Sequence, residues 1–224
     1  MTAFVPSVHG WAFPNWYPPG TPVMEIPTPF GRIPVGDAHH GVCGGMVFAA
    51  MDLFARGRLP GREPTPELVK YFGRRLLDSW NLPFGILKYY DLQCRPQAST
   101  FAAGVRVRPG AMATCVEADW PRVRAELDAG QLVALGVVKA SSFDPRHLGR
   151  NHQVLAFDYA EAGGGVTVRV YDPNYAGDDA VTLSFRPADA DAGGAIRHSC
   201  EGETVRAIFA TEYRRLPDGE PPGS

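Results

Sequence analysis

The chain has 224 residues, of which 45% are hydrophobic and 21% charged, and its formal net charge is −2. This length supports one sizeable core. The charge excludes the basic footprint of a nucleic-acid or anionic-membrane binder, and no apolar segment approaches the roughly 20 residues that span a bilayer. The N-terminus lacks the basic start and long apolar core of a signal peptide, so a cytoplasmic location is expected.

The first 40 residues are rich in aromatic residues, proline and glycine. Repeated prolines argue against a helix and against a central strand, yet the segment is too aromatic for a disordered tail. We expect residues 1–40 to wrap along the folded body. One domain is expected over residues 1–216, followed by a frayed tail over residues 217–224.

Residues 41–54 (GVCGGMVFAAMDLF) carry the first candidate functional group, Cys43. Apolar residues recur there at helical spacing, which predicts a buried helix that stops near Gly57. Cys43 would lie in the first turn, where unpaired N–H groups and the helix dipole favour a thiolate. The alternative is that Cys43 is a small buried hydrophobic residue.

Three further helices are predicted before residue 131. The first runs from Pro66 to about Trp80, with Thr65 as its N-cap, and the second is a short helix over residues 83–92. The third spans residues 119–130, with Asp119 as a cap and Gly130 at its end. Residues 104–110 are predicted to form a short edge strand or a loop.

The periodicity then changes to that of strands. Apolar runs of strand type occupy residues 131–138, 153–159, 166–172, 181–185 and 205–209, and the glycines at 163–165 predict a hairpin. Helices first and an antiparallel sheet second indicate an α+β fold. In this fold the N-terminal helices, the first of them carrying Cys43, pack on the C-terminal sheet.

A thiolate nucleophile needs a base, and the base needs a group that orients it. His152 stands just before the first hairpin strand and Asp172 ends the second, so both lie at the end of the hairpin away from its turn. Their side chains are therefore expected to meet across the ladder. Asn174 could replace Asp172, and the alternative for residues 172–174 is a simple turn.

Other candidates are weaker. His147 is a rival base, but it does not stand at the start of a strand. His39 and His40 with Cys43 lack the second ligand pair of a zinc site, so we expect no metal and no other cofactor. Cys94, Cys115 and Cys200 are expected to be packing residues, reduced as in a cytosolic protein.

The order Cys43, His152, Asp172 resembles that of the papain-like cysteine peptidases. Within this superfamily, Cys43-Gly44 and the His152 to Asp172-Pro173 pairing are most similar to the bacterial bacteriocin-processing peptidases attached to ABC exporters, whose third member is Asp. The resemblance covers the segments around the three proposed catalytic residues and the predicted sheet over residues 131–172. It implies a papain-like fold with a Cys-His-Asp triad.

The sequence also departs from this family. Papain has an aromatic residue where Gly44 follows the cysteine, and both groups carry a Gln where Asp37 stands here. A carboxylate would repel a developing oxyanion. The backbone N–H of Cys43 can supply one donor, and Asn15 or His40 a second.

The leading hypothesis is a soluble, single-domain cysteine hydrolase of peptide or amide bonds. Cys43 would attack the carbonyl, His152 would act as base and then acid, and Asp172 would orient the imidazole. A peptide or protein would be the substrate, without nucleic acid or membrane, and the oligomeric state is open. The alternatives are an acyltransferase on the same triad, and a silent binding module that recognises its partner through the aromatic residues Trp11, Phe13, Trp16 and Tyr17.

Overall fold

The computed structural model describes residues 3–20, 22–28, 31–37, 41–202 and 204–216, with only the backbone given for residues 22–28 and 31–37. The helices are α1 (Pro6–His9), α2 (Cys43–Phe54), α3 (Pro66–Ser79), α4 (Phe84–Cys94), α5 (Ala111–Thr114), the π-helical η2 (Cys115–Asp119) and α6 (Trp120–Asp128), with 3-10 turns η3 (Pro145–Arg150) and η4 (Pro187–Asp189). The strands are β1 (Pro22–Thr28), β2 (Gly31–Asp37), β3 (Thr100–Ala102), β4 (Val105–Arg108), β5 (Val133–Val138), β6 (His152–Ala162), β7 (Gly165–Tyr171), β8 (Thr182–Phe185), β9 (Ile196–His198), β10 (Thr204–Val205) and β11 (Ala207–Ala210).

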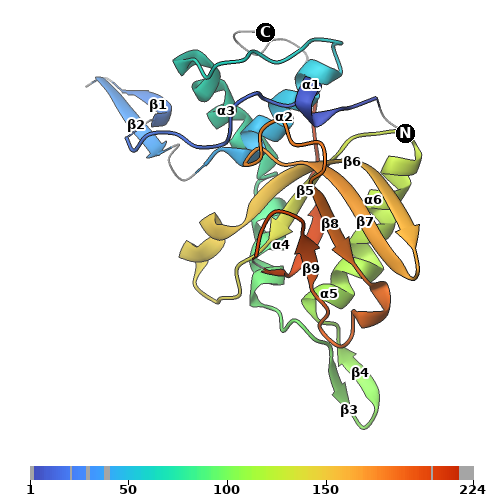
Figure 1. The fold of residues 1–224 in the computed structure, drawn as a ribbon. Helices are drawn as coiled ribbons and strands as arrows, with labels where there is room; N and C mark the ends of the chain where they lie inside the picture. Colours follow the sequence, from blue (N-terminus) through green and yellow to red (C-terminus); the bar gives the residue numbers. More distant parts are fainter. Residues whose placement is uncertain (1–2, 21, 29–30, 38–40, 203, 217–224) are drawn as a thin grey trace.

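The predicted α+β arrangement is confirmed at this level. The larger helices come first, and an antiparallel sheet of seven strands follows in the order β10-β9-β8-β7-β6-β5-β11 (Figure 1). The strands β10 and β11 are separated only by Arg206, yet they pair at opposite edges of the sheet. Because two residues span at most about 7 Å, the sheet must curl until its two edges approach each other.

Side chains alternate between the two faces of this curled sheet. Val154, Val168 and Val170 point into a cluster inside the curl that also contains α6. Leu155 and Tyr171 point to the other face, into a cluster shared with α2 and α3. The sheet therefore separates two cores, and α2 covers its outer face beside β6 (Figure 1).

The helix α2 begins at Cys43, as predicted, but it is buried all round rather than on one face. All its residues from Gly44 to Leu53 are buried. Glycine is required at the start, because a Cβ on Gly45 would collide with the Phe72 carbonyl of α3, and one on Gly44 with Gln153 and Ser79. These close approaches fix the first turn of α2 between α3 and β6.

The N-terminal segment differs from the prediction. It contains the short helix α1, which starts at Pro6, where proline is tolerated, and the two-stranded hairpin β1–β2. Prolines are compatible with this hairpin because both strands are edges. The intervening Trp11 is buried, packs against Phe72 and donates from Nε1 to the Met46 carbonyl at 3.0 Å.

The predicted elements that follow need three corrections. Asp119 does not cap α6, because η2 precedes it without a break and the Asp119 carboxylate pairs with Lys88 at 3.1 Å. The run 205–209 is split between β10 and β11 by the crossing of the sheet. The strand β9 was not predicted, because three residues are too few for a recognisable alternation. The helix α3 with its Thr65 cap and the β6–β7 hairpin agree with the prediction.

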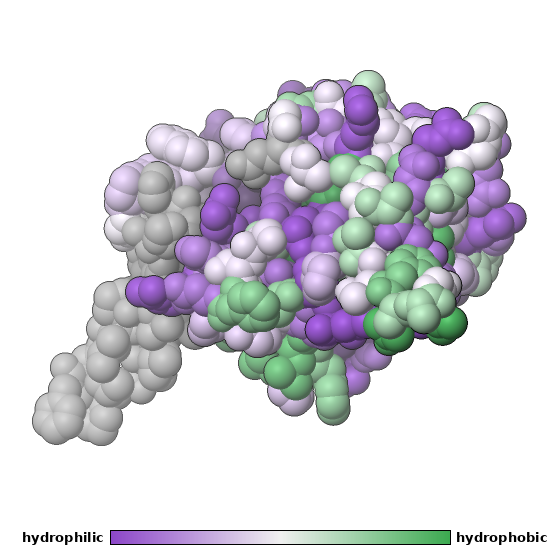
Figure 2. All heavy atoms as spheres, turned by 90° about the horizontal axis from the view of Figure 1, so that it is seen from below, coloured by the Kyte–Doolittle hydropathy of each residue, from purple (hydrophilic) through white to green (hydrophobic). Residues whose placement is uncertain are grey.

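The β3–β4 hairpin projects from the body, and its side chains are exposed (Figure 1). Figure 2 views the molecule from this side and shows hydrophobic residues in separate patches among hydrophilic ones. Within the described ranges, no helix combines the length and the hydropathy needed to cross a membrane.

Candidate active site

Five polar residues gather at one rim of the curled sheet. In an antiparallel sheet the end of one strand lies beside the start of the next. Lys139 follows β5, His152 starts β6, Asp172 follows β7, His198 ends β9, and Glu201 lies in the β9–β10 connection. The fold therefore brings together residues that are up to 62 positions apart, at the rim that the first turn of α2 approaches.

His152 and Asp172 are in contact, as predicted. Nε2 of His152 lies 2.8 Å from Oδ1 of Asp172, and both side chains are buried. The two residues are not directly opposed in the ladder, because the last pair of this end is Leu155 with Tyr171. The contact is therefore diagonal, between two side chains that extend beyond the paired part of the hairpin.

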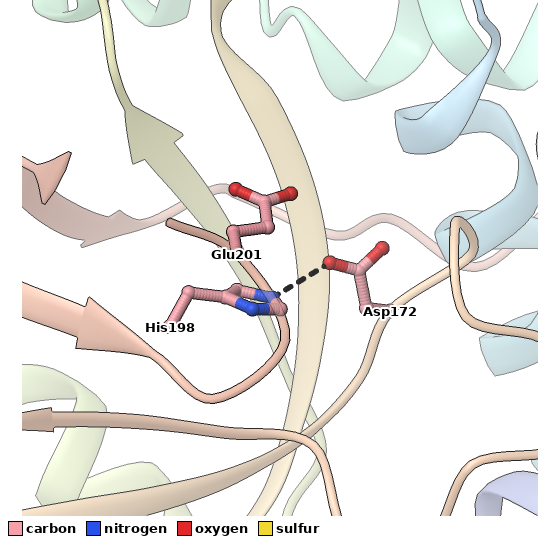
Figure 3. Close-up of side chains that lie close together, drawn as sticks. All are labelled: Asp172, His198 and Glu201. Carbon is pink, nitrogen blue, oxygen red and sulfur yellow. Dashed lines mark hydrogen bonds and ion pairs between the residues drawn. The ribbon is translucent and has the colours of Figure 1, made fainter. Parts of the chain in front are cut away.

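Asp172 is fully buried and receives three hydrogen bonds. Besides His152, the backbone N–H of Asn174 donates to Oδ1 at 2.8 Å, and Nε2 of His198 donates to Oδ2 at 3.0 Å (Figure 3). Burial alone would raise the pKa of Asp172, but the charge of His152 and these hydrogen bonds hold the pKa well below its usual range. Asp172 is therefore a carboxylate across the physiological range.

Cys43 lies close enough to His152 and to the backbone N–H of Gln153 for both to affect the pKa of its thiol. Burial raises the pKa of this thiol and Asp172 adds to the rise, while the charge and hydrogen bond of His152 and the Gln153 N–H lower it. The net result is a pKa below that of an ordinary thiol. Because Nε2 of His152 is hydrogen-bonded to Asp172, Nδ1 is the ring nitrogen that remains for interaction with Cys43.

The imidazole of His152 is the centre of this electrostatic system. Burial lowers its pKa, but the charges of Asp172 and Cys43 and the hydrogen bonds to both raise it to about 10. The lowered pKa of the Cys43 thiol and the raised pKa of His152 both favour a thiolate–imidazolium pair beside the Asp172 carboxylate. This arrangement can perform nucleophilic attack followed by proton transfer.

Of the competing candidates, Asn174 and His147 are not part of this contact set. The side-chain oxygen of Asn174 accepts from Nδ2 of Asn15 at 3.1 Å, and only its backbone reaches Asp172. His147 lies in η3 and does not contribute to the pKa of Cys43. His39 and His40, as well as the side chain of Asp37, lie outside what the structure describes.

Asn15 ties the two loops of the site together. Its Oδ1 accepts from the Val42 N–H at 2.7 Å, and its backbone N–H donates to the Pro173 carbonyl at 2.8 Å. Since its Nδ2 binds Asn174, both ends of the side chain are already engaged. We therefore read Asn15 as a residue that holds the Cys43 turn against the Asp172 turn.

His198, Glu201 and Lys139 were not among the predicted site residues, and the prediction that Cys200 is a packing residue is wrong. The side chain of Cys200 is exposed and so is not a packing residue, whereas Cys115 is buried and Cys94 half-buried. Of the site residues that were not predicted, Lys139 directly follows the apolar strand β5, His198 is the last residue of β9, and Glu201 lies three residues further on. A titratable residue at the end of a strand becomes a useful signal only once the order of the strands in the sheet is known.

Asp172, His198 and Glu201 offer ligand atoms within 4.8 Å of one another, the spacing of a possible metal site. The hydrogen bonds argue for a different use. Lys139 places its ammonium group against Glu201, and both ring nitrogens of His198 are engaged, Nε2 with Asp172 and Nδ1 with the Cys200 N–H at 3.2 Å. The cluster already has an internal cation, so we assign no metal to it.

Selective alkylation is expected at Cys43. Limiting iodoacetamide at pH 6 should label it ahead of the exposed Cys200, because only thiolates react and His152 lowers the pKa of the Cys43 thiol. Raising the pH to 8 should reduce the difference in labelling between Cys43 and Cys200. Peptide mapping by mass spectrometry measures both, and equal labelling at pH 6 would contradict the thiolate.

Comparison with protein-family models, with curated proteins and with solved structures gave no match to this chain.

Proposed function

We propose that this protein is a papain-like cysteine hydrolase of peptide or amide bonds with a Cys43-His152-Asp172 triad. The observation that carries the proposal is the position of His152, which binds the buried Asp172 through Nε2 at 2.8 Å and lies close enough to Cys43 to lower the pKa of its thiol. A nucleophile, a base and an orienting group in this order are the requirements of acyl transfer to a thiol.

In the proposed reaction, the Cys43 thiolate attacks the carbonyl carbon of a peptide or amide. The imidazolium of His152 gives its proton to the leaving nitrogen, and the amine departs as a thioester remains on Cys43. Neutral His152 then takes a proton from water, whose oxygen attacks the thioester. The C–S bond then breaks, the carboxylic acid leaves, and Cys43 departs as the thiolate, so that the imidazolium–thiolate pair forms again.

The first turn of α2 supplies a candidate donor for the oxyanion. The first α-helical bond runs from the Met46 N–H to the Val42 carbonyl, so the N–H of Cys43 precedes the bonded part of the helix. The preceding Val42 N–H is already satisfied by Asn15. In our proposal the Cys43 N–H and the positive end of α2 stabilise the oxyanion.

The similarity to the bacteriocin-processing peptidases is part of this proposal. It rests on Cys43-Gly44 at the start of a buried helix and on Asp172-Pro173 after the strand that neighbours His152. The four cysteines are unpaired, which fits a reducing cytoplasmic setting. A peptide or protein is the expected substrate.

Most of the aromatic residues that were expected to form the recognition surface of a binding module are buried. Trp11, Phe13 and Tyr17 are buried, and Trp16, at 65% exposure, remains accessible. Since Trp16 follows Asn15, which contacts both loops of the site, we propose that it contacts substrate beside the triad.

A peptide library derived from a digested proteome tests the proposed activity. Incubation with the protein should yield new peptide termini by mass spectrometry, and Cys43→Ser should yield none, because a hydroxyl of ordinary pKa cannot replace the thiolate. Added primary amines would appear in the products if the acyl group is transferred instead of hydrolysed. Selective alkylation of Cys43 without either product would contradict both enzymatic functions.

A further inference from the structure

Asp172 is shared by two histidines, of which the proposed triad uses one. His152 binds Oδ1 at 2.8 Å. His198 binds Oδ2 at 3.0 Å (Figure 3), and the side chain of His198 is fully buried. His198 belongs to β9, two strands away from the β7 strand that leads into Asp172. It touches Asp172 without being part of the contact set of Cys43.

The hydrogen bonds of His198 identify its protonation state. Nδ1 accepts from the backbone N–H of Cys200 at 3.2 Å, so Nδ1 carries no proton. Nε2 must then carry the proton of the neutral ring and donate it to Asp172. His198 is therefore an uncharged donor, whereas His152 bears the charge that balances the carboxylate.

Two side chains lie beside the ring of His198. The carboxylate of Glu201 lies near the ring and is itself paired with the ammonium of Lys139. The ring of Tyr175 packs against that of His198 at a tilt of 36°, with the two ring centroids 5.5 Å apart. A neutral His198 leaves the whole negative charge of Asp172 available to the imidazolium of His152.

We propose that His198 is a positioning residue, which fixes the Asp172 carboxylate so that Oδ1 is presented to His152. This inference rests on the proposed triad. A carboxylate bound only at Oδ1 can rotate about its Cβ–Cγ bond, and the imidazole that it holds then follows. With Oδ2 anchored by a donor from another strand, the carboxylate has one orientation, and His152 keeps its other nitrogen directed at Cys43.

Two substitutions at His198 separate hydrogen bonding from packing. His198→Leu removes the donor. We expect alkylation of Cys43 to be about threefold slower at pH 6, and the midpoint of its pH dependence to rise by about half a pH unit. His198→Gln keeps an N–H donor and is expected to stay within about twofold of the wild type. Arg197→Leu, on the exposed side of the same strand, is the control for disturbance of β9.

Nitrogen-15 NMR of the full-length wild-type protein gives a second, independent test. At pH 7 His198 should show one protonated and one unprotonated ring nitrogen, while His152 shows two protonated ones. This measurement decides the proposal even if His198→Leu does not fold.

Three results would overturn the proposal. The first is a protonated Nδ1 on His198, and the second is a pH profile of Cys43 alkylation in His198→Leu equal to that in Arg197→Leu. The third is a fall in the alkylation rate of Cys43 in His198→Gln as large as that in His198→Leu. Failure of the wild-type Cys43 to alkylate selectively would instead count against the proposed function, and the NMR measurement of His198 then stands alone.

Discussion

His152→Ala is expected to slow the alkylation of Cys43 at pH 6 by between about tenfold and 100-fold. Its imidazole supplies both the charge and the side-chain hydrogen bond that lower the pKa of the thiol. Without it, burial dominates and the pKa rises. A thiol of ordinary pKa is ionised to about one part in 300 at pH 6, which lowers the alkylation rate. A more basic thiolate is intrinsically more reactive, and this offsets part of the fall in rate.

His147→Ala is the matched control, since this histidine lies five residues earlier and makes no contribution to the pKa of Cys43. Its alkylation rate should equal that of the wild type within about twofold. Rates are measured under pseudo-first-order conditions, with circular dichroism confirming that each variant is folded. A His147→Ala protein that loses reactivity while His152→Ala keeps it would identify the wrong histidine as the base.

The pairing of His152 with Asp172 was predictable because a hairpin is a local structure. The glycines at its turn, two of which adopt positive φ, fix which ends of the strands lie together. Cys43 was predictable as the start of a helix because glycine and apolar spacing are also local signals. Its contact with His152 depends on how α2 packs on β6, and the sequence alone supported that contact only through the family resemblance.

The second histidine on Asp172 was not predictable in the same way. His198 reaches the site because β8 and β9 extend the sheet beyond β7 and the sheet then curls. Strand order is set by the packing of the whole core, and β9 is only three residues long. For the same reason, the hydrophobic pattern of residues 205–209 did not indicate that the chain passes from β10 at one sheet edge to β11 at the other at Arg206.

Asp52→Ala is expected to reduce the free energy of unfolding by about 3–5 kcal/mol, as when one partner of a buried ion pair is removed. Asp52 lies on α2, the helix that begins with Cys43, and is fully buried. Its carboxylate contacts Nε of Arg75 at 2.8 Å and accepts hydroxyl hydrogen bonds from Tyr71 at 2.9 Å and Tyr213 at 2.7 Å.

The substitution leaves the guanidinium of Arg75 buried with 1% exposure and without its main counter-ion. Tyr213 also loses its partner, so the C-terminal segment loses one of its anchors to α2. Because Arg75 would still bind the Arg214 carbonyl at 3.0 Å, the segment is weakened and not released. The loss should therefore appear as lower stability of the whole chain in urea unfolding.

Asp78→Ala supplies the matched control, because Asp78 binds the same Arg75 at 2.8 Å but its side chain is 48% exposed. An exposed ion pair of this kind contributes at most about 1 kcal/mol. Replacing both buried partners, as in Asp52→Ala with Arg75→Leu, should recover part of the stability, since no isolated charge then remains. Equal losses for Asp52→Ala and Asp78→Ala would show that burial does not govern this network. The helix that carries Cys43 would then owe its position to the close glycine contacts with α3 and β6.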